Sequence, residues 1–136
     1  MGSIRDLMTS NPTTCETSSS IADVARVMRD EDVGPVPVTE GGRLVGIVTD
    51  RDIVTRVLAE ERDLQSTTVG DICSSDLVTV TPEDDLDQAL RKMASAQVRR
   101  LPVVEGDRII GIVAQADVAR QAPEQQTGEI VEEISR

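Results

Sequence analysis

The sequence predicts a mixed α/β (α+β) fold made of two copies of one small β-α-β-β-α unit. The prediction comes from a tandem repeat, from two β-hairpin patterns and from two amphipathic helix patterns. Residues 4–56 align with residues 69–121 at a constant offset of 65, without a gap. The two segments are identical at 15 of 53 positions, where ordinary composition gives about 3. The chain is therefore an internal duplication.

The repeat also predicts the domain organisation. The first unit is expected at residues 1–60, a polar linker at 61–68, the second unit at 69–122 and a tail at 123–136. The linker is short enough to hold the two units together as one two-fold-like module. The tail is mostly polar, and it is either a frayed end or a terminal helix that contacts a second copy through its few aliphatic residues.

Each unit is expected to open with a short helical turn, at residues 4–8 and 69–73. A short extended segment follows, at residues 13–15 and 78–80. These segments come before the longest helix of each unit.

An amphipathic helix is predicted at residues 21–29 and 86–94. In both stretches apolar residues recur three and four positions apart, as in a helix that packs on a sheet. The second helix has a start pattern in which Thr81 is the N-cap and Pro82 the first helical residue.

A β-hairpin is predicted at residues 33–48 and 98–113, where two β-branched runs flank a turn that contains glycine. Pro37 and Pro102 limit the first strand of each hairpin to a short or edge strand. A further helix is expected after each hairpin, at residues 50–58 and 115–120.

Composition excludes several classes of function. The chain has no Phe, Tyr or Trp and a formal net charge of -11. Single-stranded nucleic acids are bound largely by stacking on aromatic rings, and an acidic protein repels phosphate backbones. Nucleic acid and anionic membrane surfaces are therefore unlikely partners. No apolar run has the roughly 20 residues of a membrane span, and no signal peptide is evident, so a cytoplasmic location is expected.

The sequence contains no His, and Cys15 and Cys73 are too far apart to form a CxxC pair. We expect no metal site and interpret both cysteines as small buried hydrophobic residues. There is also no nucleophile elbow and no nucleophile next to a base. The chain is expected not to be an enzyme.

Two motifs carry a family resemblance. The first is Val98-Arg99-Arg100-Leu101-Pro102-Val103-Val104, followed by Gly-Ile-Val-x-x-x-Asp. The second is Gly46-Ile47-Val48-Thr49-Asp50-Arg51-Asp52, which matches the pattern Gly-x-x-Thr-x-x-Asp. The chain resembles a tandem pair of CBS domains, named after cystathionine β-synthase, over nearly its whole length. The resemblance implies two units packed sheet to sheet with pseudo-two-fold symmetry. It also implies clefts that bind AMP, ADP, ATP, NAD or S-adenosylmethionine, and a homodimer.

Thr49 and Asp52 are the strongest candidate site residues. Thr49 ends a strand and can cap the next helix, where a hydroxyl and free backbone N–H groups stabilise a phosphate. Asp52 can accept two hydrogen bonds from a ribose diol. The alternative for Asp52 is charge stabilisation of the helix N-terminus.

The second copy departs from this pattern, because Ala114 replaces the threonine while Asp117 remains. Asp117 either binds a ribose or simply caps the helix that follows the hairpin. Arg99 and Arg100 stand where the first copy has Gly34 and Pro35. By the resemblance these arginines serve the phosphates of a nucleotide held at Asp52, and surface ion pairing is the alternative.

The resemblance also implies which residues surround the adenine. All of them are equally suited to a core or a strand: Thr14, Cys15, Val36, Pro37, Ile47 and Val48. The predicted function is a non-catalytic regulatory module that senses an adenine nucleotide and signals to a protein partner by a conformational change. The alternative is a structural interaction protein that has no physiological nucleotide.

Overall fold

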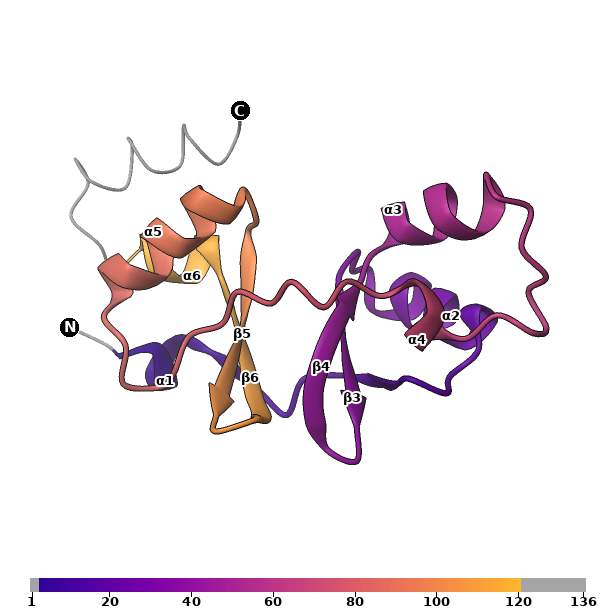
Figure 1. Ribbon diagram of the computed structural model, residues 1–136. Helices are drawn as coiled ribbons and strands as arrows, with labels where there is room; N and C mark the ends of the chain where they lie inside the picture. Colours follow the sequence, from indigo (N-terminus) through magenta and orange to yellow (C-terminus); the bar gives the residue numbers. More distant parts are fainter. Residues whose placement is uncertain (1–2, 121–136) are drawn as a thin grey trace. The chain divides into compact units, whose positions relative to one another are not determined.

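The computed structural model describes residues 3–120 of the 136-residue chain (Figure 1). The predicted tail at 123–136 lies outside the described residues. The chain divides into two compact units. We call Thr13–Leu77 the middle unit, and residues 3–12 together with 78–120 the terminal unit.

The middle unit has a small sheet in the order β4-β3-β2. Its elements are β2 (Cys15–Glu16), α2 (Ile21–Glu31), β3 (Val36–Glu40), β4 (Arg43–Val48), α3 (Asp50–Asp52), the π-helix η1 (Ile53–Leu58) and α4 (Val69–Ile72). Strand β2 runs parallel to β3, and β3 runs antiparallel to β4. Ser74 forms an antiparallel bridge with Ile47 on the other side of β4.

The terminal unit repeats this plan. Its elements are α1 (Ile4–Leu7), β1 (Thr9–Ser10), α5 (Leu86–Ala96), β5 (Arg100–Glu105), β6 (Arg108–Ala114) and α6 (Gln115–Ala119). Strand β6 lies between β1 and β5 and is antiparallel to both. Val80 forms a parallel bridge with Val103 of β5, as Cys15 does with Val38.

The sequence repeats and the compact units divide the chain at different places. The pair Thr9 and Ile112 in the terminal unit corresponds, at the offset of 65, to the pair Ser74 and Ile47 in the middle unit. The leading segment of the first repeat, which contains Thr9, thus pairs with the hairpin of the second repeat. The leading segment of the second repeat, which contains Ser74, pairs with the hairpin of the first repeat. The repeats have exchanged their leading segments.

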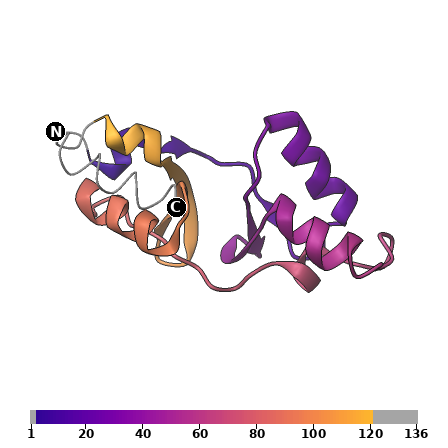
Figure 2. The same ribbon diagram turned by 90° about the horizontal axis from the view of Figure 1, so that it is seen from above.

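The predicted helices and hairpins are confirmed, and so is the mixed α/β class. In the middle unit, α2 and the α3–η1 helix lie on one face of the β3–β4 hairpin (Figure 1 and Figure 2). The predicted apolar faces are buried: Ile21, Val24 and Met28 in α2, and Leu86, Ala89, Leu90 and Met93 in α5. Each unit has its own aliphatic core. Across residues 3–120 we find no helix that is both long enough and apolar enough to cross a bilayer.

The predicted N-cap of the second long helix is wrong, although the predicted first residue of the helix, Leu86, is confirmed. The carboxylate of Asp84 accepts hydrogen bonds from the backbone N–H and the hydroxyl of Thr81, both at 2.9 Å, which closes a turn before the helix. The N-cap of α5 is Asp85, which has an extended backbone and exchanges capping-box hydrogen bonds with Gln88. Thr81 and Pro82 therefore precede the helix instead of starting it.

Candidate functional site

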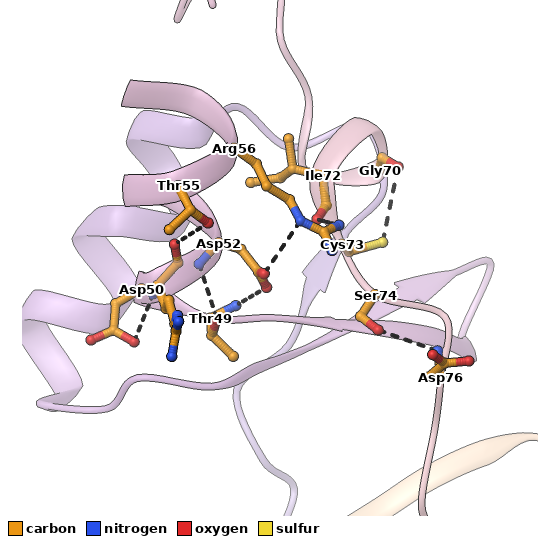
Figure 3. A network of polar contacts seen from close by, with 11 residues as sticks. Thr49, Asp50, Asp52, Thr55, Arg56, Gly70, Ile72, Cys73, Ser74 and Asp76 are labelled. Atoms are coloured by element: carbon orange, nitrogen blue, oxygen red, sulfur yellow. Dashed lines mark hydrogen bonds and ion pairs between the residues drawn. The ribbon is translucent and has the colours of Figure 1, made fainter. Parts of the chain in front are cut away.

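Thr49 and Asp52 meet where β4 passes into α3 (Figure 3). The Thr49 hydroxyl accepts a hydrogen bond from the Asp52 backbone N–H at 3.1 Å, and the Asp52 carboxylate accepts one from the Thr49 N–H at 2.9 Å. This reciprocal pair is a capping box. Thr49 is thus the N-cap of the helix, and Asp52 lies in its first turn, where the alternative of charge stabilisation of the helix N-terminus stays open.

Capping boxes also occur at helix starts where no nucleotide is expected. Ser3 with Asp6 and Thr68 with Asp71 form the same reciprocal pair. There, the hydrogen bond from the Thr68 backbone N–H lowers the pKa of Asp71. The spacing of Thr and Asp alone therefore indicates a helix start and does not identify a ligand site.

Asp52 differs from those carboxylates in its surroundings. Its side chain is only 17% exposed, and its Oδ1 lies 3.8 Å from the Arg56 Nε. A carboxylate has about four acceptor positions, and the capping hydrogen bond uses one of them. Asp52 therefore retains the capacity to accept hydrogen bonds from a diol.

The ends of β3 and β4 bring four of the predicted adenine residues together, since Val36 pairs with Val48 and Pro37 with Ile47. Cys15 joins them from β2, where its thiol lies 3.7 Å from the Pro37 carbonyl oxygen. The middle unit thus contains eight of the eleven predicted site residues: Thr14, Cys15, Val36, Pro37, Ile47, Val48, Thr49 and Asp52.

Ile47 has a backbone that is already paired. Its N–H donates to the Ser74 carbonyl oxygen at 2.9 Å, and its carbonyl oxygen accepts from the Ser74 N–H at 2.8 Å. A ligand can use the Ile47 N–H only by displacing Ser74. The free contribution of Ile47 is its side chain and the second lone pair of its carbonyl oxygen.

Arg56 and Ser74 were missed by the sequence reasoning. Arg56 lies four residues after Asp52, which is the spacing of an ion pair on a helix, so this arginine could have been found. Ser74 could not, because its contact with β4 depends on which hairpin each leading segment joins.

The two cysteines are free thiols. Cys15 is buried, and desolvation raises the pKa of its thiol from 9.0 to about 11. Cys73 is half-buried, and burial raises its pKa as well. The burial of Cys15 agrees with the prediction of a small buried hydrophobic residue, and that of Cys73 agrees with it only in part. In the part of the chain that the structure describes, no three His, Cys, Asp or Glu side chains gather in a metal-binding arrangement.

A family comparison decides which domains these repeats are. A family model for the CBS domain matches the chain twice, over residues 4–59 and 69–124. The chain belongs to the CBS domain family. The predicted resemblance is confirmed, and the two domains are the two halves of the tandem repeat.

The chain is similar to other small CBS proteins over nearly its whole length. The CBS domain-containing protein YhcV of Bacillus subtilis is 39% identical over 136 residues, covering 99% of this chain and 96% of YhcV. A crystal structure of hypoxic response protein I with two coordinated zinc ions has a TM-score of 0.81 and 34% identity, covering 90% of this chain and 100% of that one. A crystal structure of CBSX2 in complex with AMP has a TM-score of 0.77 and 28% identity, covering 93% and 99%.

The second CBS domain has a different junction after its hairpin. Ala114 is the N-cap of α6 and makes no side-chain capping bond. Asp117 instead pairs with Arg120 at 3.2 Å. The Thr79 carbonyl oxygen, which corresponds to that of Thr14, accepts a hydrogen bond from the Lys92 Nζ at 2.8 Å. The groups that would meet a ligand here are missing or engaged within the unit.

Arg99 and Arg100 lie at the start of β5, with Arg100 opposite Ala114. Both are exposed. Over residues 3–120 neither guanidinium forms an ion pair, so the alternative of surface pairing finds no partner within that range.

A groove of about 540 Å³ lies between α2 and η1 of the first CBS domain. Its walls are mainly aliphatic, and it contains none of the predicted nucleotide-binding residues: it is lined by Ile21, Ala22, Ala25, Ile53, Val54, Val57, Leu58, Glu61, Arg62 and Leu64. Val54 and Leu58 are 54% and 72% exposed. The groove is an apolar surface and is separate from the polar chemistry at Thr49 and Asp52.

Proposed function

We propose that this protein is a non-catalytic regulatory module that binds an adenine nucleotide at the β4–α3 junction. The observation that carries the proposal is the Thr49 and Asp52 pair, in which a half-buried carboxylate keeps free acceptor positions beside a hydroxyl at a helix N-terminus. The match to CBSX2 with bound AMP supports the choice of ligand class.

In this proposal the Asp52 carboxylate accepts hydrogen bonds from the ribose hydroxyls, and Thr49 contacts the phosphate. The chain has no aromatic ring for stacking, and the side chains of Val36, Pro37 and Val48 are buried in the middle unit, so the proposal assigns backbone contacts with the adenine to these residues. The phosphates also need positive charge, which the proposal assigns to Arg99 and Arg100 by the family resemblance. The proposal expects weaker binding at the Asp117 junction, because Ala114 supplies no hydroxyl there.

The proposed output is a conformational change that a second copy or another protein recognises. AMP, ADP or ATP is the proposed ligand, with NAD and S-adenosylmethionine as competitors.

Calorimetry with AMP, ATP, NAD and S-adenosylmethionine tests the proposal. We expect one of these ligands to bind below millimolar concentration. Asp52→Ala should weaken binding about tenfold or more, since it removes charge-assisted hydrogen bonds worth roughly 1.5–3 kcal/mol.

Asp71→Ala is the matched control, because Asp71 occupies the same capping position at α4. Equal losses for the two variants would show that Asp52 acts only through the helix. If none of the four ligands binds, a structural interaction protein becomes the better description.

A further inference from the structure

Arg56 connects the candidate site to another part of the middle unit (Figure 3). Its Nη1 donates a hydrogen bond to the Ile72 carbonyl oxygen at 3.1 Å, while its Nε lies 3.8 Å from the Asp52 carboxylate. One guanidinium thus joins the start of the α3–η1 helix to the end of α4. Asp52 is only 17% exposed, so its attraction for Arg56 is less screened than in an ordinary surface pair.

The Ile72 carbonyl belongs to the last residue of α4. Cys73 and Ser74 follow, and Ser74 exchanges both backbone hydrogen bonds with Ile47. Three residues later, at Leu77, the chain leaves the middle unit. Residues 72–74 are therefore held from two sides, by β4 and by Arg56, just before the connection between the units begins.

A ligand at Asp52 acts on this arrangement directly. Ribose hydroxyls that donate to the Asp52 oxygens neutralise part of the field that attracts Arg56 and occupy the space in front of the carboxylate. Arg56 then loses one of its two contacts, and its hold on the Ile72 carbonyl weakens.

We propose that Arg56 couples the occupancy of Asp52 to the order of residues 72–74, and so to the segment that leads from the middle unit to the terminal unit. This inference rests on the proposed function and adds to it a means by which binding is transmitted. It requires no contact of Arg56 with the ligand.

The second CBS domain has no counterpart of this link. Gln121, which lies outside the described residues, stands in the position that corresponds to Arg56. Asp117 pairs with Arg120, one turn along its own helix. The proposed coupling therefore belongs to the middle unit, which also contains the Thr49 and Asp52 pair.

Hydrogen exchange of single amides, with and without AMP, tests the coupling in the full-length protein. In Arg56→Gln without ligand, the amides of Cys73 and Ser74 should exchange about three- to tenfold faster, which corresponds to the loss of one hydrogen bond from a side chain that is partly exposed to solvent. Saturating AMP should move the wild-type amides in the same direction and leave those of Arg56→Gln unchanged. Arg56→Gln should bind AMP at least as tightly as the wild type, because binding to this variant does not require the contact between Asp52 and Arg56 to be broken.

Two controls separate this effect from general destabilisation. Arg26→Gln removes an exposed ion pair with Asp23 on α2 and should leave the exchange of both amides at the wild-type rate. The Val104 amide, bonded to Val80 in the terminal unit, should exchange at the same rate in all three proteins.

The coupling is overturned if the Cys73 and Ser74 amides exchange at the same rates in Arg56→Gln as in the wild type. It is also overturned if AMP binds the wild type and leaves the exchange rates of these amides unchanged. In both results the proposed function survives. If AMP fails to bind the wild type, the proposed function fails for this ligand, and the coupling fails with it.

Discussion

At the scale of single residues, the middle unit places its polar groups where each has a local use before any ligand arrives. Thr49 and Asp52 cap a helix, Arg56 joins Asp52 to Ile72, and Ser74 completes the pairing of β4. Under the proposed function, a nucleotide at this junction would exchange one set of polar contacts for another. Such an exchange makes binding weaker than a preformed empty site would, and it links binding to changes elsewhere in the unit.

Cys15 gives a prediction on pH dependence. Burial raises the pKa of its thiol from 9.0 to about 11, so the folded protein holds this proton more tightly than the unfolded chain. The stabilisation is complete below pH 9.0 and is lost as pH rises toward about 11. We expect the free energy of unfolding, measured with urea, to fall by about 2 kcal/mol over this range.

Cys15→Ala should be less stable at neutral pH but lose much less stability over the alkaline range. Cys73→Ala is the control, since Cys73 is only half-buried and should leave most of the pH dependence in place. If Cys15→Ala loses as much stability as the wild type on going to high pH, burial of Cys15 is not the cause.

At the scale of elements, α6 lacks the cap that α3 has. Ala114→Thr would place a hydroxyl where Thr49 has one, within reach of the Asp117 backbone N–H. We expect the variant to be about 1 kcal/mol more stable to urea, which is the usual value of an N-cap. Ala114→Val has nearly the shape of threonine without the hydroxyl, and it should give no such gain. If both variants change stability equally, side-chain shape explains the effect and capping does not.

The elements themselves were largely predictable from sequence, because one face of each helix and hairpin is buried and the apolar pattern records this. Ile21, Val24 and Met28 are an example. The N-cap of α5 was not predictable, because Thr81 with Asp84 and Asp85 with Gln88 are both capping patterns and follow each other directly along the chain. The order of these residues does not reveal which pair begins the helix.

The site was predictable only in part, for a related reason. Thr49 and Asp52 are close in sequence and form a recognisable motif. The pairing of Ser74 with Ile47 and the contact of Arg56 with Ile72 join residues that are far apart along the chain. A repeat alignment cannot supply them, because it shows that two segments are equivalent and does not show which hairpin each one joins.

At the scale of the whole molecule, the groove between α2 and η1 makes a homodimer the expected state. Val54 and Leu58 are exposed aliphatic residues on one face, and a second copy would remove them from water. We expect sedimentation velocity to give a dimer at micromolar concentration and Leu58→Glu to give a folded monomer. The control is Val98→Glu, since Val98 is a partly exposed residue of the terminal unit and does not line this groove. A wild-type monomer would contradict the prediction, and a dimer that persists in Leu58→Glu would place the interface elsewhere.

The exchanged leading segments have a consequence for how the chain becomes stable. A polypeptide with one repeat alone would leave the strand equivalent to β4 without its Ser74 neighbour, and it could complete the sheet only with the leading segment of another molecule. Two repeats in one polypeptide supply both segments at a high effective concentration, set by the tether and independent of protein concentration. The duplication thus turns an assembly step into an intramolecular folding step. The middle unit has all of its segments once the chain reaches Leu77, whereas β1 of the terminal unit finds its partner β6 only after the second hairpin has been synthesised.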